Sequence, residues 1–560
     1  MSVKWPPNTD FHEISLDNEV SQCPDCGEPL SPQSTRTRAF YQLTGPTKLA
    51  CHLVWCRNRA CSAYHHTRSP DAEKWLSLPR WGIGWDVLLW IGFRRFKRHW
   101  SLPQIQAELW DSYHIRLAIK TLATYVRTYQ VMVSAYYQDL SRLRTVYQKW
   151  PDVILSIDGI QPEKGHEAVY VVRELRAQRV WFAEALLSSA TAEIQALIQR
   201  ARHIAKQLDK PVYGWISDKQ DAFVTAIEAE FPGVPHRLCT NHFIRDAAEL
   251  MLALDSTAKV QMRHKVRELR ALERACLESH KDAEPSTPFT KEQQRFAAQI
   301  VLTYCAAVRG ILNDNHGGPL CPAGWRMAGA LEQIHSSLTR TLTRPATPLT
   351  PLLQRLHDCL NRGLTRYSQD VVRVGTALGY MHVVWALLQP KDGRRQPHRK
   401  LFQHWMKLAS QHDDHIIQHI GHLMERFEDG LFCGGDEFDL PDDNLDLERW
   451  IKGPKGHERR IHGRQHVGLR IVIEAPTFLV AFDAHLLRTT PFTVHDLLPY
   501  ASAEVPESQQ RAVIRHQIMR KARSQKKRGC VLEQLEQDYE QVILWTLETH
   551  GKNTSHADQC

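Results

Sequence analysis

The sequence contains no uninterrupted apolar run approaching the roughly 18 residues of a membrane-spanning helix. The chain begins with MSVKWPPNTDFHE, which lacks the apolar core of a signal peptide, so we expect a cytoplasmic protein without a membrane partner. Thirteen cysteines is an odd number, and most of them are scattered, which argues against a disulfide scaffold. Internal repeats and long low-complexity segments are also missing.

What is present is a long chain of ordinary composition. With 560 residues it exceeds the size of one hydrophobic core, so three or four folded units are expected. Hydrophobic residues make up 42% and charged residues 24%, as in folded globular proteins. The net charge of +9 is modest, but the cations are clustered, which indicates a polyanionic partner.

The local patterns predict a turn-rich segment over the first seventy residues, helices from about residue 83 to 150, and then an α/β region. Residues 130–150 are expected to continue a helix. We predict strands at 152–158, 167–173, 179–187 and 212–217, with helices at 191–208 and 219–230. This order implies a mixed sheet with helices on its faces. We also predict strands at the later runs LRIVIE and FLVAF. The predicted parts are 1–70, 71–150, 151–242 together with 440–500, a helical insertion at 243–439, and a basic tail at 501–560.

Four cysteines near the start have metal-ligand spacing. Cys23-x2-Cys26 and Cys56-x4-Cys61 form two pairs that can place four sulfurs tetrahedrally about one Zn²⁺. A loop-rich segment of this length needs such a staple to fold, so we favour structural zinc over four free thiols. Spare candidate ligands are Cys51, His65 and His66.

Residues 101–129 have the periodicity of two helices around a turn. Ser101 is a good N-cap, and Ile105 and Leu109 would face Leu117 and Leu122. The second helix can enter a major groove, although an ordinary helical hairpin has the same pattern; the basic FRRFKRHW just before it favours DNA binding. The exposed side chains of that helix would be Lys120, Thr121, Thr124 and Arg127.

Two carboxylates are placed near the ends of strands. Asp158 lies near the end of VILSIDGI, and Asp218 ends the run that starts at Val212. Carboxylate oxygens suit Mg²⁺, so the pair predicts a shared divalent cation. Asp221 is a rival for the second position, but it would lie inside the next helix. A nearby Cys239-x2-His242 pair is better explained as structural, because no partner pair is evident.

A third acid is expected downstream. We favour Glu448, on a short predicted helix, LDLERWIKG, because cations suited to a DNA strand follow it. Without the two Asp residues as further evidence, a surface ion pair with one of these cations would explain Glu448 equally well. The acids considered are Glu425, Glu428, Glu437, Glu448 and Glu458. The cations after Glu448 are Lys452, Lys455, Arg459, Arg460 and Arg464.

Taken together, these blocks resemble a known family, the DDE transposases with an RNase H-like core, of the Mutator-like and related bacterial insertion-sequence kind. The segment ILSIDG is similar to the strand of the first Asp, and Asn444 to Gly463 to the helix of the third acid. The block around the second Asp is matched by Asp218, Asp221, Ala222, Phe223, Phe231, Pro232, His236, Arg237, Cys239 and His242.

The resemblance implies an N-terminal zinc ribbon and a helix-turn-helix that bind the element's ends, followed by an RNase H-like domain interrupted by the helical insertion. Asp158, Asp218 and Glu448 would then hold two Mg²⁺ (or Mn²⁺) ions for DNA cleavage and strand transfer. Expected partners are double-stranded DNA, from the element's terminal repeats and the target, and further copies of the chain in a nucleoid-associated complex. The basic tail, with Lys526, Lys527 and Arg528, would hold flanking DNA.

Two other classes of function fit the same residues. One is a domesticated DNA-binding protein whose catalytic core no longer works. The other is an RNase H-like nuclease or resolvase that cuts DNA without transferring strands. A strand-transfer assay separates the latter from a transposase.

Overall fold

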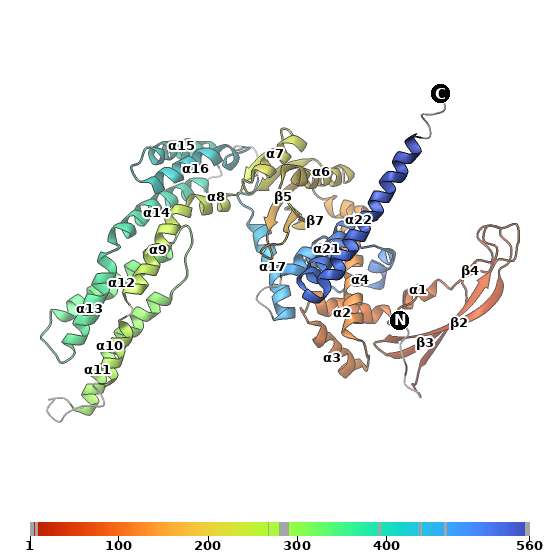
Figure 1. The fold of residues 1–560 in the computed structure, drawn as a ribbon, viewed down its shortest axis with the longest axis horizontal. Helices are drawn as coiled ribbons and strands as arrows, with labels where there is room; N and C mark the ends of the chain where they lie inside the picture. Colours follow the sequence, from red (N-terminus) through yellow and green to blue (C-terminus); the bar gives the residue numbers. More distant parts are fainter. Residues whose placement is uncertain are drawn as a thin grey trace. The chain divides into compact units, whose positions relative to one another are not determined.

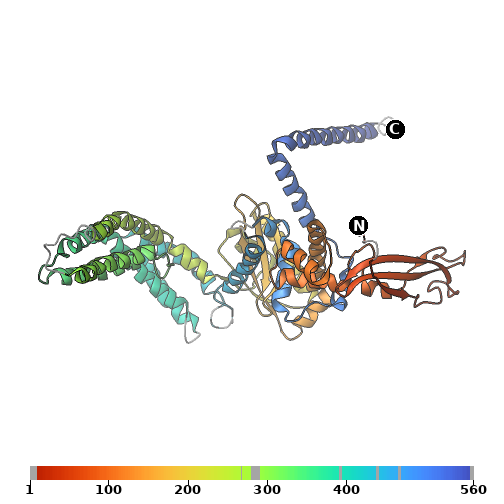
Figure 2. The same ribbon diagram turned by 90° about the horizontal axis from the view of Figure 1, so that it is seen from below.

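The computed structural model describes residues 5, 9–266, 268–278, 290–389, 394–434, 436, 440–463 and 468–554. In this part of the chain the protein is mixed α/β, with two mixed sheets and many helices (Figure 1, and turned by 90° in Figure 2). It forms two compact units. The first comprises Met1–Tyr213, Thr225–Pro232 and Leu445–Cys560, and the second comprises Gly214–Val224 and Gly233–Asn444. The division into five parts stays a prediction.

The first unit opens with a small mixed sheet whose central strand is β3. β1 pairs with β3 in parallel, whereas β2 and β4 pair with it antiparallel. Alternate residues of β3, namely Leu49, Cys51 and Leu53, are buried on one face together with Phe40, as the two-residue period of a strand requires. The strands are β1 (His12–Leu16), β2 (Ser31–Gln42), β3 (Gly45–Trp55) and β4 (Thr67–Arg68).

Helices follow as the sequence predicts. At the start of α3 the hydroxyl of Ser101 accepts the backbone N–H of Gln104, and the Gln104 side chain accepts the backbone N–H of Ser101. His114, with φ of 54°, ends α3 in the left-handed region. The four residues predicted to pack together, Ile105, Leu109, Leu117 and Leu122, are all buried in the core of the first unit. The helices are α1 (Ala72–Leu76), α2 (Trp85–Phe96), α3 (Leu102–Tyr113) and α4 (Ile119–Gln138).

The continuous helix predicted over 130–150 is wrong. α4 ends at Gln138, and α5 (Leu140–Tyr147) begins after Asp139. The Asp139 carboxylate accepts the backbone N–H groups of Ser141 and Arg142, so this residue acts as an N-cap and divides the helix.

The β-β-β-α-β-α order predicted for the α/β region is confirmed. β5, β6 and β7 form an antiparallel meander in the first unit. In the second unit, Trp215–Ser217 of β8 pairs in parallel with β9. The elements are β5 (Val153–Ile160), β6 (Ala168–Glu174), β7 (Arg179–Leu186), α6 (Thr191–Gln207), β8 (Val212–Ser217), α7 (Asp221–Glu230) and β9 (His236–Leu238).

The remainder of the second unit is helical, as predicted, and has two apolar cores. One is built on α8, α14, α15 and α16, and the other on α9 to α13. The helices are α8 (Thr240–Ala247), α9 (Glu249–Lys265), α10 (Leu269–Glu278), α11 (Lys291–Asn313), α12 (Ala323–Leu342), α13 (Thr350–Thr365), α14 (Ser368–Leu388), α15 (Arg395–Ser410) and α16 (His415–Leu431).

Two of these helices are long and apolar enough to cross a membrane by length and composition alone: Glu292–Asn313 and Ser368–Leu388. Core helices pass the same test, and Val374, Leu378 and Met381 of α14 are buried in the helical core. The two helices are therefore weak support for a membrane span, and the cytoplasmic location stays a prediction.

The strands predicted at LRIVIE and FLVAF are wrong, because both runs are helical. α18 (Gly468–Ile473) and α19 (Ala475–Leu487) follow a longer α17 (Leu445–His462). α19 is buried from Ala475 to His485 and packs against α4 and β7. A helix enclosed on all sides has no polar face, so a short apolar run cannot be distinguished from a strand by its period.

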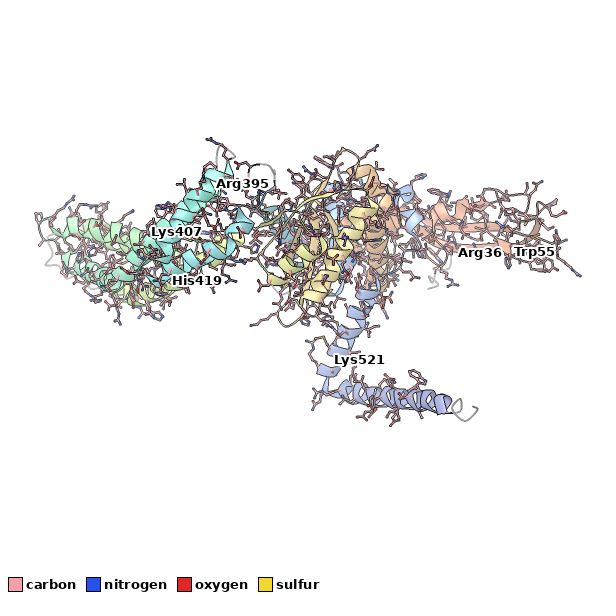
Figure 3. All side chains as sticks on the ribbon, turned by 90° about the horizontal axis from the view of Figure 1, so that it is seen from above. Arg36, Trp55, Arg395, Lys407, His419 and Lys521 are labelled. Atoms are coloured by element: carbon pink, nitrogen blue, oxygen red, sulfur yellow. The ribbon has the colours of Figure 1, made fainter. Side chains whose placement is uncertain are left out.

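The first unit closes with the C-terminal helices. α21 packs against α18 and α19, and α22 packs against α21. Figure 3 labels Lys521, which lies on α21, and also Arg36 of β2 and Trp55 of β3. The elements are α20 (Val494–Leu497), η1 (Leu498–Tyr500), α21 (Glu507–Arg523) and α22 (Gln525–Thr554).

Candidate functional site

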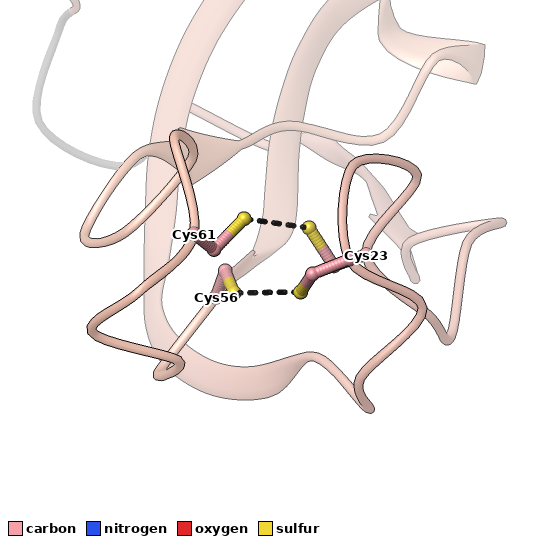
Figure 4. Close-up of side chains that lie close together, drawn as sticks. Cys23, Cys56 and Cys61 are labelled. Carbon is pink, nitrogen blue, oxygen red and sulfur yellow. Dashed lines mark hydrogen bonds between the residues drawn. The ribbon is translucent and has the colours of Figure 1, made fainter.

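The four N-terminal cysteines converge as their spacing predicts. The Sγ atoms of Cys23 and Cys61 are 3.8 Å apart, and those of Cys26 and Cys56 are 3.7 Å apart (Figure 4). All four sulfurs lie within 4.8 Å of one another. A tetrahedron with Zn–S bonds of about 2.3 Å places its sulfurs about 3.8 Å apart, so the cluster has the size that zinc requires.

Two tight turns hold these thiols. The Gly27 N–H donates to the Cys23 carbonyl, and the Ala63 N–H donates to the Cys61 Sγ. Backbone N–H groups of Asp25 and Cys26 lower the pKa of the Cys23 thiol to about 7, whereas burial raises the pKa of the Cys56 thiol, so a bound metal must displace a proton there. These residues can therefore bind a structural zinc ion.

The spare zinc candidates are not part of this cluster. Cys51 is buried in the core of the sheet, on β3. The ring of His65 packs edge-on against Trp55, with centroids 4.3 Å apart. Among the described residues, the group of possible metal ligands at this site consists of the four cysteines alone and does not include Cys51, His65 or His66.

Asp158 is one of the buried acids of the first unit. It lies on β5 with 6% of its surface exposed, directly opposite Val171 of β6. Ser156 is paired with Arg173 in the same register. Directly opposite residues, and residues two apart on one strand, share a face of the sheet. Asp158, Val171 and Arg173 therefore project from the same face.

α17, the helix of Glu448, packs on that face. The Arg173 Nε donates to the Asp446 carboxylate at 2.6 Å, and its guanidinium lies 5.7 Å from the centre of the Trp450 ring. Val171, Leu447 and Trp450 belong to one buried cluster. The first turn of α17, which includes Glu448, is thereby anchored to the face of the meander that carries Asp158. Sequence reasoning missed Arg173 and Asp446, because only the folded register brings them together.

Asp218 directly follows β8 in the second unit. Its Oδ1 is buried and has no hydrogen-bond partner among the described residues. Burial raises the pKa of this carboxyl above its ordinary value, although the Gln220 N–H and the Arg245 charge lower it. A buried carboxylate oxygen that accepts no hydrogen bond is suited to bind a cation, because the cation would supply the missing partner. Asp221, its rival, is exposed at the first position of α7.

His242 lies beside Asp218 in the second unit. A carboxylate oxygen of Asp218 and a ring nitrogen of His242 are within 4.8 Å, as are ligand atoms of Cys239 and His242. Burial lowers the pKa of His242 to about 4, so its ring is neutral at neutral pH. The Cys239 Sγ accepts the backbone N–H of Asn444 at 3.2 Å. This contact supports the structural interpretation of Cys239, and His242 flanks Asp218 as the sequence predicts.

The predicted triad is divided between the two units. Asp158 and Glu448 belong to the first unit and Asp218 to the second, so the convergence of all three carboxylates stays a prediction.

Two rival third acids already have cationic partners. Glu428 pairs with Arg399 at 2.7 Å, and Glu458 is buried against Arg470 at 3.0 Å. Glu425 is exposed on α16. Glu437 and Arg464 lie outside the described residues.

The predicted DNA-binding side chains are largely at the surface. Lys120, Thr124 and Arg127 are exposed on α4, and Thr121 is half-buried there. On α17, Lys455 is half-buried and the other three cations are exposed; these are Lys452, Arg459 and Arg460. Lys526, Lys527 and Arg528 are exposed at the start of α22. Exposure leaves these groups accessible to phosphates, but their contact with DNA stays a prediction.

No protein-family model matches this chain, and no curated protein matches it.

Proposed function

We propose that the protein is a DDE transposase, which binds the ends of a mobile element and catalyses DNA cleavage and strand transfer. The observation that carries the proposal is the buried, donor-free Oδ1 of Asp218 at the end of β8. It is supported by the anchoring of the Glu448 helix on the face of the meander that carries Asp158. The order of strands and helices supports an RNase H-like core.

In this proposal Asp158, Asp218 and Glu448 are the ligands of the catalytic cations. Bound Mg²⁺ or Mn²⁺ would activate the attacking water or 3′-hydroxyl and stabilise the leaving oxygen. The carboxylates would hold the cations that orient the reacting phosphate, and neutral His242 adds no positive charge beside Asp218.

DNA recognition is assigned to the first unit. The four-cysteine cluster would stabilise a zinc ribbon, and α3 and α4 would act as a helix-turn-helix. The capped start of α3 and the exposed Lys120, Thr124 and Arg127 support this role. Two element ends must be joined in one complex, so a homo-oligomer is part of the proposal.

The test uses the full chain, Mg²⁺ and DNA fragments from either side of its gene. Asp158→Asn, Asp218→Asn and Glu448→Gln should each abolish cleavage and strand transfer while leaving DNA binding intact. Matched controls are Asp221→Asn and Glu425→Gln, which remove other exposed acids and should leave both reactions unchanged.

Each other outcome has a defined meaning. Cleavage that persists in Asp158→Asn or Asp218→Asn rejects the metal-site assignment. Binding without cleavage in the unaltered chain identifies a domesticated DNA-binding protein. Cleavage without joined products identifies a nuclease or resolvase.

A further inference from the structure

A second group of metal-ligand side chains lies away from the four cysteines, within the first unit. His166 and Glu167 lie in the loop between β5 and β6, directly before β6, and His516 lies on α21. One ligand atom from each of the three lies within 4.8 Å of the others. Residues separated by about 350 positions in the sequence thus meet at one point, which no local pattern predicts.

Two of the three side chains are buried, and His166 is half-buried. Glu167 is 6% exposed and His516 is 7% exposed. The Nε2 of His516 lies 3.1 Å from Oε2 and 3.2 Å from Oε1 of Glu167. The ring of His166 lies 5.2 Å from that of His516, tilted by 32°. The Nδ1 of His166 is buried and has no hydrogen-bond partner among the described residues.

A buried polar atom without a partner is costly unless a ligand satisfies it. Two imidazole nitrogens and one carboxylate are the donor set that protein sites use for zinc and other first-row divalent ions. We propose that His166, Glu167 and His516 form a second metal site, which takes a divalent transition-metal ion such as Zn²⁺ and fixes α21 to the segment between β5 and β6.

The charges around the group define a competitor for this ion. Arg515, adjacent to His516 on α21, forms an ion pair with Glu167. Because this ion pair occupies the carboxylate, the guanidinium of Arg515 must leave Glu167 when the ion binds.

This competition separates a metal site from an ion pair that only staples the helix. If Glu167 serves the ion pair alone, removing Arg515 leaves a buried carboxylate with one partner fewer and gains nothing. If Glu167 is a metal ligand, removing Arg515 removes the competing cation and tightens metal binding. Arg515 has 32% of its side chain exposed, so it can turn toward solvent when displaced.

The first experiment measures zinc bound after saturation and removal of free metal, in the full chain carrying Asp158→Asn and Asp218→Asn, which remove the proposed catalytic cation site. We expect two equivalents in this otherwise unaltered chain, one for the cysteines and one for the second site. His516→Gln and His166→Gln should each bind one, retained by the cysteines, whereas Cys23→Ser should lose the other. His203→Gln, which alters an exposed histidine of α6, should still bind two.

The second experiment titrates zinc into chains that carry the same two substitutions and whose cysteine site is already filled. Arg515→Gln should bind the second equivalent at least several-fold more tightly than the unaltered chain, a gain that misfolding cannot produce. One equivalent in the unaltered chain, or unchanged or weaker binding in Arg515→Gln, would overturn the proposal and leave an Arg515–Glu167–His516 ion-pair staple. Neither readout depends on transposition, so the site can fail independently of the proposed function.

Discussion

The first unit and the α9–α14 helices of the second unit bury different kinds of side chain. The first unit encloses Arg173, Asp483 and Glu458, each connected to a partner of opposite charge. Across the described residues of α9–α14, the one buried charged side chain is Asp255, and the cores are otherwise apolar.

The kind of side chain that a core buries affects how strictly the core determines one packing arrangement. An apolar core accepts many arrangements of similar volume, whereas a buried ionic network is satisfied by few. The networks of the first unit connect β6, α17 and α19, the elements that position Glu448 relative to Asp158. We infer that the first unit requires precise positioning of β6, α17 and α19, and that the packing of the α9–α14 helices is less strictly determined.

Breaking the network should have the largest effect. Asp483 accepts Arg173 at 3.1 Å and the Val180 N–H at 2.8 Å, and it also accepts the Tyr137 hydroxyl. Asp483→Ala leaves the Arg173 charge buried with one partner fewer and should reduce the free energy of unfolding by about 3–5 kcal/mol. Chemical denaturation followed by circular dichroism measures this. The exposed Asp17→Ala should change it by less than about 0.5 kcal/mol; equal effects would contradict the comparison.

Acid should weaken the first unit by a smaller amount. Burial lowers the pKa of His485 to about 3, and the nearby charges of Lys97 and Arg488 act in the same direction. The unfolded chain binds the proton near pH 6.5 and the folded chain does not, so stability is complete above pH 6.5 and falls as the pH drops toward 3. At pH 5.5 this histidine alone should reduce the free energy of unfolding by about 1.4 kcal/mol.

The acid effect is checked by denaturation at pH 7.5 and 5.5. Tyr129 shares a hydrogen bond of 3.1 Å with His485, so His485→Gln retains a polar partner while removing the titration. That variant should lose part of the pH dependence. An identical pH dependence in the variant would show that His485 binds its proton equally well in the folded and unfolded protein, and so contradict the lowered pKa.

In the α9–α14 helices, the one buried charge acts locally. The Asp255 carboxylate accepts the backbone N–H groups of Gly324 and Trp325 at 2.8 and 2.7 Å, at the start of α12. Asp255→Ala should therefore cost what a lost helix cap costs, about 0.5–2 kcal/mol. Asp255→Asn, which keeps an acceptor oxygen, should recover most of it. A loss as large as that of Asp483→Ala would show that the helices also depend on buried charge.

The smallest effect is expected where volume is kept in the apolar core. Leu356 is fully buried on α13, and Leu356→Met should cost less than about 1.5 kcal/mol because methionine fills a similar space. The cavity-forming Leu356→Ala should cost about 2–5 kcal/mol. Differential scanning calorimetry of both variants checks this. If the two variants lose the same free energy of unfolding, this apolar core tolerates changes of side-chain shape no better than the first unit does.

Most elements with a local signal could be predicted from the sequence. The strands of the meander alternate or are rich in β-branched residues, and α3 has a capping residue at Ser101 and a first-turn proline. The cysteine cluster was predictable because metal spacing is itself a local pattern. Asp218 could be placed after β8 because it directly follows a short apolar run, which is also a local pattern.

The failures are long-range. The run FLVAF within α19 was predicted as a strand, because its burial is set by packing against α4 and β7 and not by a local pattern. The connection of Arg173 to Asp446 and Asp483 joins residues about 300 positions apart. The approach of His516 to Glu167 depends on the same kind of packing, so neither a periodicity nor a motif could have indicated it.

The first unit is made from segments that leave the ribosome far apart in time. Its meander is complete at Leu186, but the helices that cover it, α17 and α19, follow the whole of Gly214–Asn444. At about 5–20 residues per second, synthesis of that segment takes about 10–50 s. During this interval Val169, Val171 and Val180 cannot yet contact Phe478 and its neighbours, with which they share a core in the finished protein. Newly made chains should therefore depend on chaperones until translation passes Leu487.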